Sequence, residues 1–314
     1  MQKAGGEDEI ATAAGCPSDS GMAGRASACE GCPGRELCSQ QGGVDPDQAG
    51  INVRMNAIRH KVIVLSGKGG VGKSSVAATL AMALAAAGHK VGIVDLDICG
   101  PSVPKLLGVE GMPVVNSEYG WLPLKSPHYD IKVMSVGSLL TDADSAIVWR
   151  GPRKTGIIKR FLKDTLWGRL DFLIFDTPPG TSDEHLTVLS ALKQAKPDGA
   201  VLVSTPQDSA LVTVRKEITF CNKMGLRILG VVENMAGYVC PCCGEHTDIF
   251  SSKGAQKLAT EFNLPYLGQV PLDPTLTQQC ETGSDIFKAA PNSVSAKAMS
   301  TIANTVLEMV KQSR

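Results

Sequence analysis

The segment LSGKGGVGKSS, residues 65 to 75, has the residue types and the spacing of a loop that binds phosphate groups. It matches the pattern G-x-x-x-x-G-K-[ST], follows an apolar run and leads into a helical pattern, as such a loop requires. Glycines let backbone N–H groups wrap an anion, and the start of the next helix adds a favourable dipole. A glycine-rich turn without a ligand is the alternative. The residues predicted to bind the nucleotide here are Gly67, Lys68, Gly69, Gly70, Val71, Gly72, Lys73, Ser74 and Ser75.

The polar side chains of this loop have separate predicted roles. Lys73 supplies positive charge to the β- and γ-phosphates of ATP, Ser74 is placed to ligate Mg²⁺, and Ser75 is expected near the α-phosphate. A second lysine, Lys68, follows the first glycine directly, although a loop of this type needs only one. Lys68 is therefore either an exposed loop residue or a group with a target of its own.

Acidic residues follow two further apolar runs. VDLDICG places Asp95 and Asp97 after one run, and FDTPPG places Asp176 and Gly180 after another. Because ligands bind at the carboxyl edge of a parallel sheet, we expect Asp176 to be an outer-shell carboxylate for Mg²⁺ and Gly180 to offer its N–H to the γ-phosphate. Asp95 is expected to be structural. The alternative for Asp97 and Asp176 is that they cap turns or helices.

Ten cysteines form the second chemical signal, and one group of them lies in YVCPCCGEH, residues 238 to 246. Cys240 and Cys243 have C-x-x-C spacing, but a metal site needs two such pairs and only one is present. A disulfide, an iron–sulfur cluster, buried thiols and a zinc site that includes His246 are the possible readings. We assign no role to Cys242.

A second group of cysteines lies near the N-terminus, in a stretch rich in Gly, Ala, Ser and Asp that cannot build a hydrophobic core. We predict that something other than packing holds this stretch. The cysteines in this group are Cys16, Cys29, Cys32 and Cys38. The remaining three, Cys99, Cys221 and Cys280, occur singly, and we expect each to behave as a small buried hydrophobe.

The elements that must position these residues alternate along the chain from Lys61 onward. Short β-branched runs are separated by Ala-rich or amphipathic stretches, which predicts an α/β fold with a doubly wound, mainly parallel sheet. The segment MPVVNSEYGWLPLK is expected to form a small hairpin. We therefore divide the chain into an irregular Cys-rich segment, residues 1–55, and an α/β domain, residues 56–314. The predicted strands are KVIVLS, VGIVDL, IKVMSV, DFLIFD, GAVLVS, LRILGVV and YLGQV.

Composition limits the partners and the compartment. The formal net charge is zero, so neither nucleic acid nor an anionic membrane surface is an expected partner. The N-terminus lacks the features of a signal peptide and no apolar run approaches the length of a membrane span, so we expect a cytoplasmic protein. In a reducing compartment, clustered cysteines are better read as metal ligands than as disulfides.

The segment KGGVGKSS resembles the deviant phosphate loop of the MinD and nitrogenase iron protein class. The resemblance implies a nucleotide-dependent dimer in which Lys68 reaches the phosphates of the partner subunit. It implies that Asp97 positions or activates the attacking water, so that Lys68, Lys73 and Asp97 form the catalytic group. The amide of Asn234, in VVENMAGY, is expected to read the adenine edge, and VPLDP, which contains Pro271, resembles the loop that covers the base.

Taken together, the motifs resemble the Mrp/ApbC-type scaffold ATPases over nearly all of residues 55 to 290. The motifs that carry this resemblance are the phosphate loop, DLDICGPS, WRGP, FDTPPGTSDEH, ENMAGYVCPCCGE and PLDP. The N-terminal cysteines resemble the C-x13-C-x2-C-x5-C segment of the eukaryotic cytosolic iron–sulfur assembly scaffold. Here Cys29, Cys32 and Cys38 keep the spacing, whereas twelve rather than thirteen residues separate Cys16 from Cys29.

The resemblance implies an ATPase that builds a 4Fe-4S cluster between two subunits and transfers it to cytosolic and nuclear apo-proteins. Cys240 and Cys243 of each subunit would hold the bridging cluster, and the N-terminal cysteines would hold a second 4Fe-4S cluster within one chain. The partner is either a second copy or, in a heterotetramer, a related P-loop scaffold protein. Two other functions share the phosphate loop: a MinD- or ParA-like positioning ATPase, and an electron carrier like the nitrogenase iron protein. For the first, a C-terminal amphipathic helix could bind a surface, although we expect it to dock on its own sheet.

Overall fold

The computed structural model describes residues 25–30, 45–139 and 151–312. The chain divides into two compact units, Met1–Ala49 and Gly50–Arg314. In the first unit, the described residues include a short 3₁₀ helix, Ser27–Cys29. Helix α2 (Gln48–Asn56) begins before residue 55, up to which we expected no regular structure. Its residues Ile51 and Met55 are buried one turn apart, which is the helical spacing that the polar surroundings of this segment concealed.

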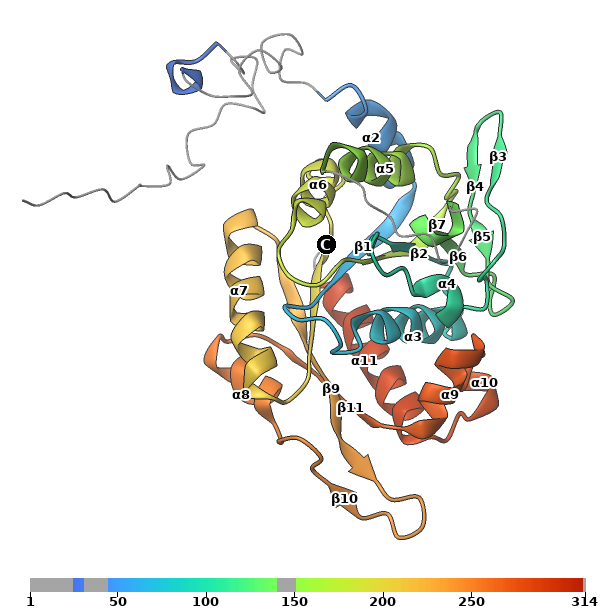
Figure 1. Cartoon of the computed structure of the whole chain (residues 1–314), viewed down its shortest axis with the longest axis vertical. Helices are drawn as coiled ribbons and strands as arrows, with labels where there is room; N and C mark the ends of the chain where they lie inside the picture. The colour runs from blue at the N-terminus through green and yellow to red at the C-terminus, as the bar shows by residue number, and fades with distance from the viewer. Residues whose placement is uncertain (1–24, 31–44, 140–150, 313–314) are drawn as a thin grey trace, which may run out of the picture. The chain divides into compact units, whose positions relative to one another are not determined.

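A mainly parallel sheet runs through the second unit (Figure 1). Within the described part of the chain its strand order is β10-β9-β8-β1-β7-β2-β6-β5, and β11 pairs with β9. Only the pairings of β5 and β10 are antiparallel in this part of the sheet. The seven predicted strands are all present. The strands are β1 (Ile58–Leu65), β2 (Val91–Asp95), β5 (Leu124–Lys125), β6 (Lys132–Ser135), β7 (Leu170–Asp176), β8 (Gly199–Ser204), β9 (Ile228–Val239), β10 (His246–Thr247) and β11 (Tyr266–Leu272).

Helices cover both faces of the sheet, as Figure 1 shows, and this confirms the predicted doubly wound α/β fold. Alternate residues of β1 explain why: Val62 and Val64 enter one core, and Ile63 and Leu65 enter the other. One face carries α2, α5 (Gly151–Lys163), α6 (Asp183–Leu192), α7 (Asp208–Met224) and α8 (Gly254–Glu261). The other carries α3 (Lys73–Ala86), α4 (Val103–Leu106), α9 (Pro274–Thr282), α10 (Ile286–Ala289) and α11 (Val294–Lys311).

Two smaller predictions concern the hairpin and the C-terminal helix. Strands β3 (Val115–Ser117) and β4 (Gly120–Leu122) pair antiparallel, which confirms the predicted hairpin. Helix α11 packs against β11 and α3, and its apolar stripe is buried at Met299, Ile302 and Val306. The C-terminal helix therefore docks on its own fold, as expected. No helix within the described ranges is long and apolar enough to cross a membrane.

The three strands that carry the predicted nucleotide residues are neighbours in the sheet. Strand β7 pairs with β1 on one side and with β2 on the other. In register, Asp176 lies opposite Val64 of β1 and opposite Asp95 of β2. Because the strands are parallel, the loops after β1, β2 and β7 leave the sheet at one edge, and this edge positions the site.

Candidate functional site

The phosphate loop follows β1 and forms a cavity of about 210 Å³. Gly70 and Gly72 adopt left-handed φ angles of 80° and 79°, which favour glycine. A side chain at Gly67 would meet the main chain of Thr213 at 2.5 Å, so this position also has no room for one. The cavity is lined by Ser66, Lys68, Gly69, Gly70, Val71, Gly72, Lys73, Ser74, Ser75, Asp97 and Pro179. The structure thus brings together all but one of the predicted loop residues around one space, Gly67 being the exception.

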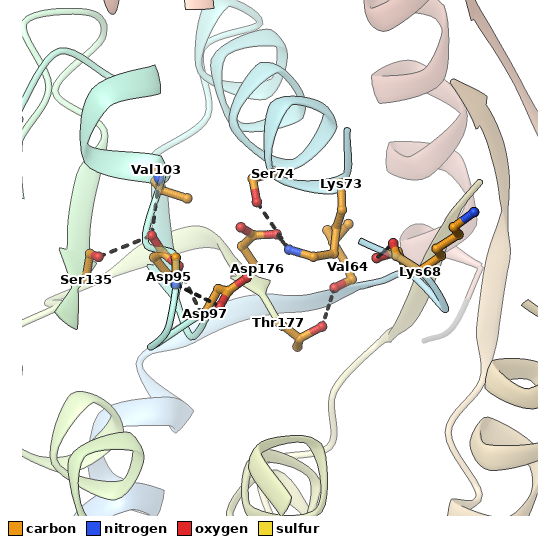
Figure 2. A network of polar contacts seen from close by, with 12 residues as sticks. Val64, Lys68, Lys73, Ser74, Asp95, Asp97, Val103, Ser135, Asp176 and Thr177 are labelled. Atoms are coloured by element: carbon orange, nitrogen blue, oxygen red, sulfur yellow. Dashed lines mark hydrogen bonds and ion pairs between the residues drawn. The ribbon is translucent and has the colours of Figure 1, made fainter. Parts of the chain in front are cut away.

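Lys73 is the cation at the centre of this site (Figure 2). Its Nζ forms a buried ion pair with Asp176 and lies 3.2 Å from the Oγ of Ser74. Only one carboxylate oxygen of Asp176 is used, because Oδ2 is buried and has no hydrogen-bond partner among the described residues. Burial raises the pKa of Asp176, although the Lys73 ammonium opposes that shift. The arrangement leaves the buried Oδ2 of Asp176 as a hydrogen-bond acceptor beside Lys73 and Ser74. Such an oxygen could accept a hydrogen bond from a water molecule bound to a metal ion.

Asp95 shapes the loop that carries Asp97. Its Oδ1 accepts from the N–H of Asp97 over 3.1 Å, and its Oδ2 accepts from the N–H of Val103 over 3.2 Å and from the Oγ of Ser135 over 3.1 Å (Figure 2). Asp95 is buried, whereas Asp97 is half-buried at the cavity and accepts from the N–H of Gly100. Asp95 therefore joins both ends of the loop to β6, and Asp97 faces the space where a nucleotide would lie.

Lys68 points away from Lys73 and is exposed (Figure 2). Its Nζ lies 3.4 Å from the Oγ of Ser209, in the first turn of α7. An exposed contact of this length holds the side chain weakly. In a single chain, Lys68 is thus an exposed loop residue, and its reach toward a partner subunit stays a prediction.

Two residues predicted to contact the nucleotide are engaged with the protein in this state. The N–H of Gly180 donates to the carbonyl of Ser66 over 2.8 Å, so it must release that carbonyl before it can reach a γ-phosphate. The Nδ2 of Asn234 donates to the carbonyl of Val71 over 2.9 Å, and Asn234 is buried. Its amide therefore holds the phosphate loop here, and a role at the adenine edge stays a prediction. Pro271 is half-buried in β11.

A salt bridge that the sequence analysis missed links α5 to the segment after β7. Lys154 Nζ lies 2.9 Å from Oε1 of Glu184, in the first turn of α6, and the Glu184 side chain is only 7% exposed. The same Nζ lies 3.8 Å from the Sγ of Cys99. Cys99 is exposed, so the expectation that it is a buried hydrophobe was wrong; it lies in the loop after β2, where the chain leaves the core. No signal in the sequence pairs these distant residues.

The other single cysteines differ in exposure. Cys221 is fully buried in α7, as expected, and burial raises the pKa of its thiol to about 12. Cys280 is only half-buried, in α9, so the expectation holds for it in part.

The central cysteines lie in a tight turn that follows β9. The N–H of Cys240 donates to the carbonyl of Glu245 over 2.9 Å, and the N–H of Gly244 donates to the carbonyl of Cys240 over 2.8 Å. Cys242 and Cys243 are exposed and Cys240 is half-buried. The N–H groups of Cys243 and Cys242 hydrogen-bond to the Cys240 sulfur and lower the pKa of its thiol. The turn therefore favours a thiolate, the form that binds metals.

These thiols do not form a complete metal site in one chain. Within the described ranges, no group of three or more His, Cys, Asp or Glu side chains is arranged to hold a metal ion. His246 points elsewhere, because its Nε2 lies 3.3 Å from the carbonyl of Ala236. Of the N-terminal cysteines, Cys29 is buried in its 3₁₀ helix, and Cys16, Cys32 and Cys38 lie outside the described residues.

A profile of the ParA family, described as NUBPL iron-transfer P-loop NTPase, matches residues 57–307. The chain belongs to this iron-transfer P-loop NTPase family. A nucleotide-binding protein from Archaeoglobus fulgidus, solved in complex with ADP, is 39% identical with a TM-score of 0.67, over 79% of this chain and 98% of that one. Membership confirms the predicted P-loop ATPase and the resemblance to the Mrp and MinD proteins.

Two archaeal MinD proteins have the same fold. The cell division ATPase MinD of Pyrococcus furiosus is 25% identical with a TM-score of 0.61, over 80% of this chain and 99% of that one. MinD of Pyrococcus horikoshii, solved with Mg-ADP, is 23% identical with a TM-score of 0.59, over 82% of this chain and 99% of that one. This iron-transfer NTPase therefore has a MinD-type ATPase fold.

Proposed function

We propose that this protein is an ATP-dependent scaffold that assembles a 4Fe-4S cluster between two subunits and transfers it to apo-proteins. The observation that carries the proposal is the cysteine turn, in which Cys243 is exposed and Cys240 half-buried, in an iron-transfer NTPase that also has a phosphate loop. A 4Fe-4S cluster takes four thiolates, and each chain offers two here. Two turns that meet across a two-fold axis supply all four.

The nucleotide site suits ATP with Mg²⁺. Ser74 and Asp176 would hold the ion, since the unpartnered Oδ2 of Asp176 fits an outer-shell role and Ser74 lies in the first turn of α3, beside the Lys73–Asp176 ion pair. Lys73 would turn from Asp176 toward the phosphates when these enter the cavity. Bound Mg²⁺ neutralises charge on the β- and γ-phosphates.

Hydrolysis would depend on Asp97, which lines the phosphate cavity, and on Lys68, which is exposed. Asp97 lines the cavity and orients the attacking water, and Asp95 fixes the loop that carries it. Lys68 acts on the nucleotide of the partner subunit, which its exposed position permits. Hydrolysis is then tied to the dimer, and we expect it to be slow and coupled to cluster transfer.

The protein would hold two clusters. The cluster at the central turn is transferred to acceptors, and the cluster at the N-terminus stays bound. Cys16, Cys29, Cys32 and Cys38 belong to one chain, so a cluster on them needs no partner. A cluster on Cys240 and Cys243 depends on two chains, which makes it the transferable one. A mononuclear zinc site with His246 is less well supported, because the His246 ring contacts the backbone at Ala236.

The partner subunit is a second copy or a related P-loop scaffold, and the acceptors are apo iron–sulfur proteins. A cytoplasmic location fits the use of exposed thiols as metal ligands. The zero net charge supports neither nucleic acid nor a membrane as a partner. A positioning ATPase is the less supported alternative, since α11 is buried in the fold and such an ATPase has no use for the cysteine turn.

Anaerobic reconstitution of the full chain tests this proposal. The purified protein is incubated with ferrous iron and sulfide, desalted, and examined by absorption and Mössbauer spectroscopy with iron and sulfide counts. We expect 4Fe-4S spectra, with one part of the iron and sulfide requiring Cys240 and Cys243 and the other part remaining on the N-terminal cysteines. Zinc uptake without sulfide would overturn the proposal, and a cluster that survives repeated redox cycles without transfer would favour an electron carrier.

A further inference from the structure

The second half of strand β9, from Asn234 to Val239, connects the phosphate loop to the cysteine turn. At Asn234 it is held to the loop by the hydrogen bond to the Val71 carbonyl. A side chain at Gly72 would begin only 2.2 Å from the Asn234 amide nitrogen, so the two segments are in close contact. Cys240 follows the last residue of the same strand. Val71 and Gly72 line the phosphate cavity. A displacement of these two residues would therefore also displace Asn234 of β9.

The strand is not regular between these two points. Asn234 pairs with Val270 of β11, and Tyr238 pairs with Leu272. Three residues of β9, 235–237, thus lie opposite a single residue of β11 and form a bulge. We did not predict this bulge from the sequence, although a lone glycine within an apolar strand is its usual sign.

The bulge has an unusual backbone. Met235 adopts φ of 57° in the left-handed region, where a residue other than glycine is uncommon, and Gly237 adopts φ of 76°. The conformation of Met235 is strained and persists where surrounding contacts enforce it. At this point β9 and β11 are therefore not held in the regular register of a parallel pair.

His246 connects the bulge to the cysteine turn. Its Nε2 lies 3.3 Å from the carbonyl of Ala236, and a side chain at Gly237 would begin 2.5 Å from the same nitrogen. Its backbone pairs with Val239, which precedes Cys240. The His246 imidazole therefore contacts the bulge, and the backbone of β10, to which His246 belongs, pairs with β9 directly before the cysteine turn.

We propose that the bulge of β9 couples the nucleotide site to the cysteine turn, and that His246 is the positioning residue that carries the coupling to Cys240 and Cys243. This inference rests on the proposed function and names its regulation. Nucleotide changes the position of Val71 and Gly72, Asn234 moves the bulge, and the His246 ring moves the turn with it. A ligand shifts only an equilibrium whose two states it binds differently, and the phosphate loop provides that difference.

The test measures thiol reactivity in the metal-free full chain. Alkylation of Cys240 and Cys243 by iodoacetamide is followed by mass spectrometry of the peptide that contains them, resolved by fragmentation, with and without Mg²⁺ and a non-hydrolysable ATP analogue. In the parent, nucleotide should change the rate by at least about fivefold, as expected for a coupling of about 1 kcal/mol. His246→Ala should reduce the change to less than about twofold, and His246→Gln, which can still donate to Ala236, should retain it.

Thr247→Ala, in the same short strand, is the matched control and should respond as the parent does. Binding of the analogue is measured separately for each variant. A full response in His246→Ala, or no response in a parent that has bound the analogue, would overturn the coupling. The alkylation assay uses no iron. If the protein took up no cluster, the proposed function would be wrong, but a nucleotide-dependent alkylation rate that requires His246 would still support the coupling.

Discussion

Asp95 and Asp176 lie directly opposite each other at the carboxyl ends of the neighbouring parallel strands β2 and β7. Both carboxyl groups are buried, but only Asp176 forms an ion pair with Lys73. Burial, together with the charge of Asp176, raises the pKa of Asp95 to about 8. Two neighbouring buried acids with only one cation beside them make the nucleotide-free site sensitive to pH.

The first prediction follows from the pKa of Asp95, which rises from 3.8 to about 8 on folding. The folded protein then binds more protons than the unfolded chain between these values, so the free energy of unfolding must fall as pH rises through this window. Asp95→Asn should make that fall shallower in nucleotide-free protein, measured by urea denaturation at a series of pH values. Because burial raises the pKa of Glu217 to about 7, the comparison is best made in a Glu217→Gln background. An unchanged slope in Asp95→Asn would contradict the raised pKa.

The second prediction concerns Lys73. Lys73→Ala should abolish ATP binding, because the backbone alone compensates the triphosphate charge poorly, and calorimetry measures this directly. It should also lower the stability of the nucleotide-free protein by about 3 kcal/mol, since Asp176 is left buried without its cation. Adding Asp176→Asn should restore much of the stability and none of the binding. Unchanged ATP affinity in Lys73→Ala would refute the assignment of this loop.

The third prediction separates the two lysines of the loop. Lys68→Ala should keep nucleotide affinity close to that of the parent but slow ATP hydrolysis by about tenfold or more, because its proposed target lies in the other subunit. Ser209→Ala removes only the exposed partner of Lys68 and should change the rate by less than about twofold. A steady-state phosphate-release assay measures both variants. Equal rates in Lys68→Ala and the parent would exclude a role in trans.

The fourth prediction uses the left-handed backbone at Met235. Met235→Gly relieves the strain, whereas Met235→Val increases it, because a β-branched residue is poorly accommodated there. Thermal denaturation should find the valine variant less stable than the glycine variant by about 1–2 kcal/mol. The reverse order would show that the bulge is not strained.

The sheet and the nucleotide edge were predictable because their signals are local. Alternating β-branched runs fix the strands, and Asp95 and Asp176 end two of them, so a parallel sheet must bring both to one edge. Glycine spacing in the phosphate loop likewise requires the backbone that Gly70 and Gly72 adopt.

What the sequence could not supply are contacts between distant segments. Lys154 meets Glu184 and Cys99 through the packing of α5, so Cys99 is exposed where a buried residue was expected. The Asn234 amide is engaged by Val71, a relation set by how β9 lies against the phosphate loop. Helix α2 was missed because two buried residues in a polar segment give a weak periodic signal.

The most direct test of the scaffold is transfer of iron and sulfide from the reconstituted protein to a separated apo-acceptor. Cys240→Ala with Cys243→Ala should remove the transferable cluster and preserve an N-terminal cluster signal, and Cys29→Ala with Cys32→Ala should do the reverse. Replacement of Cys242, the exposed neighbour in the same turn, is the matched control and should transfer as the parent does. We expect the variant without Cys240 and Cys243 to deliver no cluster to the acceptor. A full complement of iron and sulfide delivered by that variant would show that the protein does not transfer a cluster from the central cysteines.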